Sequence, residues 1–304
     1  MSFLASINGV ITPAEEARVC VLDNGFTFGD SVYEVLRTYG GQPFEPGRHF
    51  RRLHTSATRL GFDVPFPAED LLGRTDDLLE RAANDESYIR IIVSRGLGDC
   101  SYAFDRVQGP TLVMICKPFA PPPAWHYERG IKAAAVAIRR NHPRALDPAI
   151  KSSNLLNNVL AVREAQSREA EEPVLLNHEG FLAEGASTNV FMVRDGAVLT
   201  APLAAGILAG ITREVVLELL PGLGVPFREQ PLHLDDLVSA DEAFLTSTTR
   251  EVVPVRQVDD ALIGDGTPGA ITRRLIQAFR AYAPLHCGAA ALSVAASPSG
   301  RTSG

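Results

Sequence analysis

Three consecutive prolines interrupt the chain at residues 121–123. A proline ring fixes φ and removes the backbone N–H, so this run can continue neither a helix nor a central strand. The 304 residues are enough for two domains, each with its own hydrophobic core. The run therefore predicts an interdomain linker at 120–130, between a small domain at 1–119 and a larger one at 131–287. The low-complexity segment 288–304 is predicted to be a disordered tail.

Both predicted domains contain strands as well as helices. In the first, apolar residues of the segment 49–60 recur at helical spacing. The strand-like runs of this domain are INGVIT (7–12), ARVCVL (17–22), SVYEVLRTYGGQPFE (31–45), SYIRIIVSRG (87–96) and PTLVMICKPF (110–119). Asn-Gly and Gly-Gly pairs within them are typical of tight turns.

The second predicted domain begins with the strand-like run IKAAAVAI at 131–138. The next predicted helix has good N-cap residues before it and one apolar face: the caps are Ser152, Ser153 and Asn154, and the face is Leu155, Val159 and Val162. Strand-like runs joined by polar turns follow, then a helix with Thr212 as its predicted N-cap. Two further strands are predicted around the polar corner of 242–255. Both halves together predict an α+β fold.

The composition disfavours several classes of partner. The formal charge of −7 and the pI of about 5.5 argue against nucleic acid or an anionic membrane surface. The first ten residues show no signal-peptide pattern, and no apolar run is long enough to span a bilayer. The four cysteines are scattered without CxxC spacing, which is typical of reduced thiols in a cytosolic protein and indicates no metal site. We therefore expect a cytoplasmic protein that acts on a small molecule.

Lysine is rare in this chain, which has 29 basic residues but only three lysines: Lys117, Lys132 and Lys151. Lys151 lies at a predicted element boundary beside a proline-bearing segment, where its amine could form a Schiff base with a carbonyl compound. The alternative is an ordinary solvated lysine. Glu184 lies among apolar residues of a predicted strand, where an acid costs free energy unless it is paired. A pyridinium nitrogen would suit it, although an acid satisfied at a strand edge is equally compatible with the pattern.

Three segments suggest a phosphate site. Gly210, Ile211 and Thr212 open a predicted helix, whose free N–H groups and dipole suit an anion. The corner Ser247-Thr248-Thr249 supplies hydroxyls, and Arg52 is predicted to project off the apolar face of its helix. Each feature has an ordinary alternative: a helix cap for Thr212 and a solvated side chain for Arg52. Neither GxxxxGK[ST] nor a strand–GxGxxG–helix unit occurs, so nucleotide binding is not supported.

Taken together, these segments resemble the signature of class IV pyridoxal-phosphate aminotransferases. The resemblance rests on EGASTNVF, VLT and LAGITR in this order and spacing, and on DNGFTFGDSVYEV, KSSNLLNNVLA and TSTTREVVPV. It spans residues 3–280. The family includes D-amino-acid aminotransferases, branched-chain aminotransferases and aminodeoxychorismate lyase. The resemblance implies a small N-terminal α/β sandwich, a larger C-terminal pseudo-barrel domain, pyridoxal 5'-phosphate in the cleft between them, and a homodimer.

The resemblance also implies roles for individual residues. Lys151 matches the lysine that holds the cofactor as a Schiff base and then moves the proton of the substrate Cα. Glu184 matches the acid that keeps the pyridine nitrogen protonated, so that the ring can accept electrons. Leu208 matches the leucine packed on the ring face. The matches to the phosphate site are Arg52, Ile211, Thr212, Ser247 and Thr248.

The substrate pocket combines features of several members of the family. D-amino-acid aminotransferases, which SNLL, FGDSVYEV and TSTTREVVPV resemble most, commonly have an Arg-x-His pair where this chain has Cys100 and Tyr102. Branched-chain enzymes usually carry a tyrosine where this chain has Leu155. The sequence SYIR, by contrast, is reminiscent of branched-chain enzymes.

Arg90 is the predicted clamp for the substrate carboxylate, because a guanidinium binds a carboxylate bidentately. A structural ion pair is its alternative role, and Arg139 or Arg140 would then be the next candidates for the clamp. The other residues expected in the pocket are Phe28, Tyr33, Tyr88 and Thr249.

The resulting prediction is a ping-pong transaminase that favours D-amino acids, with 2-oxoglutarate or pyruvate as acceptor. Within the family, the alternatives are an L-branched-chain transaminase, an (R)-amine transaminase and a pyruvate-releasing lyase. Outside it, the alternatives are a cofactor-free protein that inherits the fold and a lysine-dependent aldolase.

Overall fold

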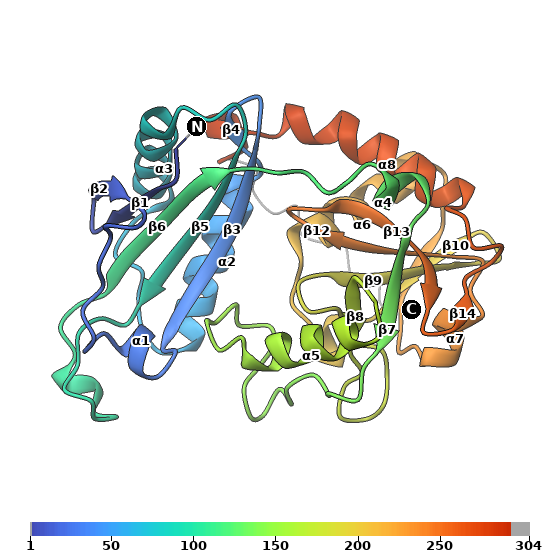
Figure 1. Ribbon diagram of the computed structural model, residues 1–304, viewed down its shortest axis with the longest axis horizontal. Helices are drawn as coiled ribbons and strands as arrows, with labels where there is room; N and C mark the ends of the chain where they lie inside the picture. The colour runs from blue at the N-terminus through green and yellow to red at the C-terminus, as the bar shows by residue number, and fades with distance from the viewer. Residues whose placement is uncertain (1, 293–304) are drawn as a thin grey trace.

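The computed structural model describes residues 2–292, which form two β-sheets flanked by helices (Figure 1). The first sheet has the strand order β2-β1-β6-β5-β3-β4, and all its neighbouring strands are antiparallel. Its strands are β1 (Leu4–Ile7), β2 (Val10–Pro13), β3 (Ser31–Tyr39), β4 (Gln42–Pro43), β5 (Ser87–Ser94) and β6 (Thr111–Pro118). The helices of this half are α1 (Asn24–Thr27), α2 (Pro46–Arg59) and α3 (Ala68–Ala82).

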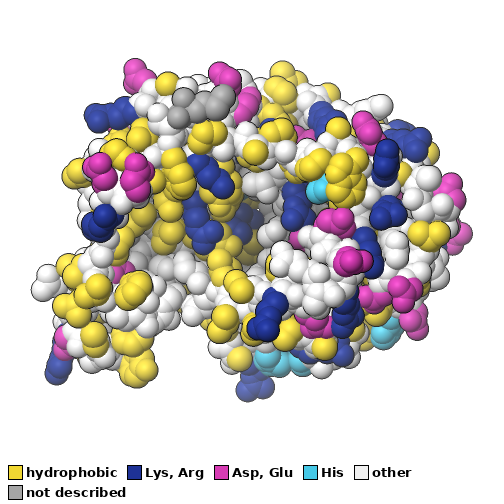
Figure 2. Space-filling view, in the orientation of Figure 1, with side chains coloured by type: hydrophobic (Ala, Val, Ile, Leu, Met, Phe, Trp, Pro, Cys, Tyr) yellow, Lys and Arg dark blue, Asp and Glu magenta, His cyan; other side chains and the backbone are white. Residues whose placement is uncertain are grey.

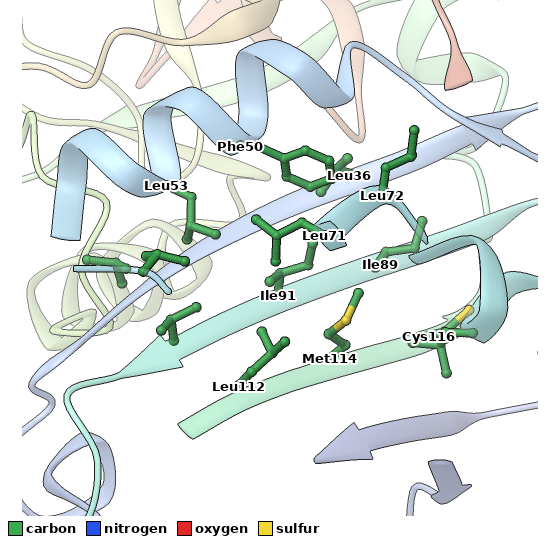
Figure 3. Packing of buried hydrophobic residues seen from close by; sticks show 14 of the residues in the cluster. Leu36, Phe50, Leu53, Leu71, Leu72, Ile89, Ile91, Leu112, Met114 and Cys116 are labelled. Atoms are coloured by element: carbon green, nitrogen blue, oxygen red, sulfur yellow. The ribbon is translucent and has the colours of Figure 1, made fainter. Parts of the chain in front are cut away.

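The first hydrophobic core lies between this sheet and the helices α2 and α3 (Figure 3). Phe50, Leu53 and Ala57 lie on one face of α2 because they recur at helical spacing, and all three are fully buried. They pack against side chains such as Leu36 of β3 and Ile91 of β5. The helix predicted from this spacing is confirmed, whereas α3 was not predicted from the sequence.

The strand predicted at 17–22 is wrong. These residues form an irregular segment, and Val19, Val21 and Leu22 are exposed. A short apolar run has strand propensity, but it forms a strand only where a neighbouring edge supplies hydrogen-bond partners. In this protein, β2 is the strand that pairs with the outer edge of β1 in the first sheet.

The second sheet has the strand order β11-β10-β9-β12-β13-β7-β8, with β14 also paired to β13. Its strands are β7 (Ile131–Ala135), β8 (Glu172–Val174), β9 (Asn189–Arg194), β10 (Ala197–Thr200), β11 (Phe227–Glu229), β12 (Glu242–Ser247), β13 (Glu251–Val258) and β14 (Ala261–Leu262). The helices are α4 (Trp125–Glu128), α5 (Leu156–Ser167), α6 (Ile211–Gly222), α7 (Leu234–Val238) and α8 (Ala270–Tyr282). Pairing is mixed, because β7 runs parallel to both β13 and β8.

Both faces of the second sheet are buried. Along β9, Val190 and Met192 belong to the core on one face, whereas Phe191 and Val193 belong to the core on the other face. The helices α6 and α8 cover this second face and contribute residues such as Val215 to its core. Burial on both sides explains why β9 is an almost continuous apolar run. The result is an α+β, two-domain architecture.

The two halves meet in an ionic cluster around the buried Glu251. Arg37 of β3 forms an ion pair of 3.1 Å with Glu251 of β13, and the hydroxyl of Tyr39 donates to the same carboxylate at 2.9 Å. Arg280 of α8 pairs with the other oxygen of Glu251 at 2.9 Å. These contacts fix the first sheet against the second at one end of the space between them.

The proline run lies between β6 and α4. The tail predicted to be disordered begins differently: Gly288–Ala291 form a short 3-10 turn, and Leu292 packs against the first core. The remainder of that tail, 293–304, lies outside the described residues. No helix within residues 2–292 is both long and apolar enough to cross a membrane. These residues also contain no group of three or more His, Cys, Asp or Glu side chains that could hold a metal ion.

Candidate active site

A cavity of about 510 Å³ lies between the two halves of the molecule. Its wall includes Tyr33 of β3 and Arg90 of β5 from the first sheet, and Lys151 and Thr248 from the other half. A smaller cavity of about 80 Å³ shares much of this lining and extends to Glu184 and Thr212. Figure 2 shows a hollow between the halves with Lys and Arg side chains on its walls. The space is thus lined by cations although the chain as a whole is acidic.

Lys151 is held in place by its backbone. Its carbonyl accepts a hydrogen bond of 2.9 Å from the N–H of Tyr33, and its own N–H donates to Ser56 Oγ of α2 at 3.2 Å. Its Nζ lies 4.6 Å from the centre of the Tyr33 ring. The other lysines are elsewhere: Lys132 Nζ donates to the carbonyl of Arg168, and Lys117 is exposed beside Tyr88. Lys151 is therefore the lysine that lines both cavities.

The helix after Lys151 differs from the prediction. It begins at Leu156, and none of the predicted cap residues bonds its first turn. Its core-facing residues are the small Ala161 and Ala165. The predicted apolar face instead lines the larger cavity: Leu155, Val159 and Val162. Helical spacing identified an apolar face correctly, but what covers that face is decided by the neighbouring elements.

Glu184 is buried and accepts three hydrogen bonds within the protein. Its Oε1 accepts a hydrogen bond from Arg140 Nε at 2.7 Å, within an ion pair whose side chains are 11% and 6% exposed. Its Oε2 accepts from the backbone N–H of Leu208 at 3.0 Å and from Asn189 Nδ2 at 3.4 Å. Arg140 was one of the two predicted substitutes for the carboxylate clamp. The structure shows that its guanidinium binds Glu184, whereas Arg139 is exposed and lines neither cavity.

Arg52 is oriented by Glu34, a residue that was not predicted from the sequence. The Nε and Nη2 atoms of Arg52 donate to the two oxygens of Glu34 at 2.7 and 2.8 Å, and its Nη1 donates to the carbonyl of Ala209 at 2.7 Å. His49 Nδ1 lies 2.7 Å from Glu34 Oε2. The signal was available: Glu34 is a lone acid in the apolar strand SVYEVL, and it is fully buried.

The pKa values of Glu34 and His49 are set by contacts within the buried cluster of Glu34, His49 and Arg52. Burial alone would raise the pKa of Glu34, but the charge and hydrogen bonds of Arg52, together with the hydrogen bond from His49, outweigh it and hold that pKa well below its ordinary value. Burial lowers the pKa of His49, and Glu34 offsets this only in part. We therefore infer a neutral imidazole that donates from Nδ1 to the Glu34 carboxylate. Its Nε2 is buried without a hydrogen-bond partner in the described chain.

Glu34→Gln should lower the free energy of unfolding by about 3–5 kcal/mol, because it breaks a buried ion pair and leaves Arg52 without its anion. The folded-state pKa of Glu34 lies below the ordinary value of 4.5, so this stabilisation is fully present above pH 4.5 and disappears only as the pH falls through the lower folded-state value. Urea unfolding at pH 7 and pH 5 tests both statements. Glu80→Gln, at an exposed position of α3, is the matched control. A loss at pH 7 that has vanished by pH 5 would contradict the lowered pKa.

The start of α6 has donor groups that would suit an anion. Gly210 is the N-cap, so Thr212 lies inside the first turn, and the prediction that Thr212 is the cap is wrong. Its hydroxyl is buried and has no hydrogen-bond partner in the described chain. The first N–H groups of a helix likewise lack intrahelical acceptors, and the helix dipole favours an anion there. Thr212 and Ile211 line the smaller cavity together with Arg52, Ser247 and Thr248.

Gly210 is required by close packing. A Cβ at this position would lie 2.0 Å from Asn189 Oδ1 and would displace it. Asn189 also donates to the carbonyl of Leu208 and to Glu184, so the same amide ties the start of α6 to the acid. The smaller cavity thus brings together Arg52 and the start of α6, which suit a phosphate, with the carboxylate of Glu184 and the amine of Lys151. These groups fit pyridoxal phosphate.

The residues expected around the substrate mostly line the larger cavity. Tyr88 and Arg90 lie on one face of β5 because side chains alternate along a strand. Arg90 Cζ lies 4.2 Å from the centre of the Tyr33 ring, and within residues 2–292 this guanidinium forms no ion pair. Thr249 also lines this cavity. Phe28 does not: it packs against Tyr102, with ring centroids 5.0 Å apart.

Comparison with known proteins places this arrangement in one family. A family model described as amino-transferase class IV matches residues 31–258. A putative branched-chain-amino-acid aminotransferase of Methanocaldococcus jannaschii is 38% identical over 274 residues, which cover 90% of this chain and 94% of that protein. The D-alanine aminotransferase of Staphylococcus haemolyticus is 35% identical over 277 residues, covering 91% and 96%.

Solved structures agree with the sequence comparison. The branched-chain amino acid aminotransferase of Escherichia coli superimposes with a TM-score of 0.87 and 30% identity, over 95% of this chain and 97% of that chain. The T.th. branched-chain amino acid aminotransferase, solved with pyridoxamine 5'-phosphate, has a TM-score of 0.85 and 29% identity, over 92% and 93%. The chain therefore belongs to the class IV aminotransferases, enzymes that depend on pyridoxal 5'-phosphate.

Proposed function

We propose that this enzyme transfers the amino group of a D-amino acid to 2-oxoglutarate or pyruvate by a ping-pong mechanism. The observation that carries the proposal is the convergence of Lys151, Glu184 and Arg52 on one pair of cavities whose larger member also holds the cation Arg90. Arg90 supports an amino acid as the donor, because its guanidinium faces the cavity and can bind a carboxylate bidentately.

We assign the cofactor contacts from the geometry of the smaller cavity. Arg52, Ile211, Thr212, Ser247 and Thr248 hold the phosphate, and Leu208 packs on the ring. Bound pyridoxal phosphate supplies the carbonyl carbon that receives the amino group and the ring that withdraws electrons from the substrate. Glu184 would accept a hydrogen bond from the ring nitrogen. Lys151 Nζ would hold the cofactor covalently and, as a free amine, would move the proton of the substrate Cα.

Whether the enzyme takes a D- or an L-amino acid depends on where in the cavity the substrate carboxylate binds relative to Lys151. Its backbone is fixed to Tyr33 and Ser56, so Nζ reaches Cα from one side only. Exchanging a D- for an L-amino acid on that side exchanges the places of the carboxylate and the side chain. The lining of the larger cavity offers a carboxylate either the guanidinium of Arg90 or the hydroxyl residues Ser247, Thr248 and Thr249.

An L-branched-chain amino acid is the second candidate donor. Leu155, Val159 and Val162 give the larger cavity an apolar wall that suits a branched side chain. The Methanocaldococcus relative and the solved branched-chain enzymes support this reading, whereas the D-alanine aminotransferases support the first. Half-reactions with matched D- and L-pairs of alanine, glutamate and leucine, followed at the cofactor absorbance, discriminate between the two. A faster reaction with every L-isomer would contradict the D-amino-acid proposal.

Arg90→Leu should impair amino acids by roughly 10- to 150-fold in kcat/KM, the equivalent of the ~1.5–3 kcal/mol of a hydrogen bond to a charged group. Primary amines such as (R)-1-phenylethylamine have no carboxylate to lose, so they should be affected much less. Arg163→Leu on α5 is the matched control for the loss of an exposed arginine at the same cavity. If Arg90→Leu slowed both substrate classes equally and lowered the melting temperature, Arg90 would be structural.

We further propose that two copies associate beside this cavity. Phe26, Tyr102 and Phe104 are 74%, 85% and 69% exposed, and Leu156 of α5 is 70% exposed. Side chains of this size and polarity favour a protein contact over water. Sedimentation equilibrium of the purified enzyme tests the dimer, and a monomer at micromolar concentration would contradict it.

The division of the chain is likewise a proposal. The strands of the first sheet end at Pro118 and those of the second begin at Ile131. This supports a small domain at 1–119, a linker at 120–130 and a large domain from 131. The ordered turn Gly288–Ala291 supports moving the end of the large domain beyond 287.

A further inference from the structure

The ion pair between Arg140 and Glu184 places two opposite charges side by side in the lining of the smaller cavity. Arg140 Nε donates to Glu184 Oε1 at 2.7 Å, and both side chains are nearly buried. Arg140 Nη1 donates to Asn157 Oδ1 at 3.1 Å and to Asn158 Oδ1 at 3.4 Å. The Arg140 guanidinium is thus held between the acid and the first turn of α5.

The hydrogen bonds of Glu184 leave little of its capacity unused. A carboxylate has about four acceptor positions. Three donors approach it within the protein: Arg140 at Oε1, and Leu208 N–H and Asn189 Nδ2 at Oε2. One position therefore remains for a donor in the smaller cavity, and Arg140 fixes the direction in which it points.

Arg140 also supplies the cation that a buried carboxylate requires. A buried carboxylate without a cation is costly. A guanidinium stays protonated at every physiological pH, so the ion pair at Glu184 Oε1 always has its cation. A ring nitrogen in the smaller cavity would therefore meet Glu184 as one half of an ion pair.

We propose that Arg140 is a positioning residue that keeps Glu184 anionic and oriented, so that the proton between Glu184 and the cofactor resides on the ring nitrogen. The inference rests on the proposed contact between Glu184 and that nitrogen. In this proposal, Arg140 and Glu184 together maintain the electron-withdrawing state of the ring, instead of Glu184 alone. The backbone N–H of Arg140 donates to the carbonyl of Leu176 at 2.9 Å, which anchors the arginine independently of any ligand.

The test compares two cofactors on the full-length protein freed of its own cofactor. Pyridoxal phosphate carries the ring nitrogen, and its 1-deaza analogue carries a C–H group of the same shape. The wild type should bind pyridoxal phosphate more tightly than the analogue, as measured by fluorescence titration. Arg140→Met should reduce that preference by roughly 10- to 150-fold, the range expected for a hydrogen bond to a charged group. Arg139→Met, at the exposed neighbour, should keep it.

Two further variants separate charge from packing. Arg140→Lys retains the charge and should restore part of the preference. Arg140→Gln can still donate to Glu184 but is neutral, and it should lose the preference as Arg140→Met does; it replaces Arg140→Met if that variant does not fold.

A variant without the Arg140 charge that weakens both cofactors equally would overturn the proposal and leave Arg140 a structural residue. If the wild type itself showed no preference between the two cofactors, the proposed contact of Glu184 with the ring nitrogen would be refuted. The inference about Arg140, which rests on that contact, would be refuted as well. If the wild type kept its preference and Arg140→Gln did too, only the role of Arg140 would fail.

Discussion

Lys151→Ala is expected to abolish the covalent attachment of pyridoxal phosphate and to lower turnover by at least ~10²–10⁴-fold, the usual contribution of a general acid–base group. Lys151 is the lysine that lines both cavities, and its backbone is tied to Tyr33 and Ser56, so no other amine of the described chain can take its place without a large movement. The measurement is reduction with borohydride followed by peptide mass mapping. The cofactor mass should appear on the peptide that carries Lys151 in the wild type and be missing from the variant.

The remaining lysines and one conservative change complete the experiment. Lys117→Ala and Lys132→Ala should keep both attachment and turnover, because the first side chain is exposed and the second bonds the carbonyl of Arg168. Lys151→Arg keeps the positive charge but cannot serve as the amine nucleophile, so it should fail as alanine does. Attachment that survives in Lys151→Ala and disappears in Lys132→Ala would refute the assignment. A wild type that binds no pyridoxal phosphate would favour the cofactor-free alternative.

Glu184→Gln is expected to lower turnover by roughly 10- to 150-fold or more, because a hydrogen bond to a charged group is lost at the ring nitrogen. The change nearly preserves size, so the phosphate end of the site should still bind cofactor. In the variant, the NH₂ group of the glutamine replaces one carboxylate oxygen and so faces a hydrogen-bond donor. This holds for either orientation of the amide, because Arg140 donates to one oxygen of Glu184 and the Leu208 N–H donates to the other. Single-turnover kinetics with saturating cofactor measures the effect on the chemical step directly.

Glu179→Gln is the matched control, because Glu179 is an exposed acid on the turn just before Glu184. It should leave turnover unchanged. If Glu184→Gln turned over at nearly the wild-type rate with saturating cofactor, the charge of Glu184 would be irrelevant to the reaction. If it failed only through weak cofactor binding, Glu184 would serve binding and not the electronic state of the ring.

The strongest elements of the fold were readable from local patterns. Phe50, Leu53 and Ala57 follow helical spacing and form the buried face of α2, because the period of the sequence matches the period of the helix. The apolar run of β9 similarly predicted a strand, and the proline run marked the passage between the two sheets. Patterns fail where the local signal is weak: the run at 17–22 has strand propensity but no neighbouring strand edge to pair with.

The candidate site shows the same division. The sequence by itself determined which side chains are available: a rare lysine at position 151, an acid at 184 among apolar residues, and a glycine-opened helix at 210. The family was indicated by the resemblance of the surrounding motifs, such as EGASTNVF and LAGITR, to those of class IV aminotransferases. The tertiary structure decided their partners. It freed the Thr212 hydroxyl by making Gly210 the cap, turned Val159 toward the cavity, and paired Arg140 with Glu184. These outcomes depend on contacts between residues far apart in the chain, and local propensity carries no information about which distant surface will cover a given face.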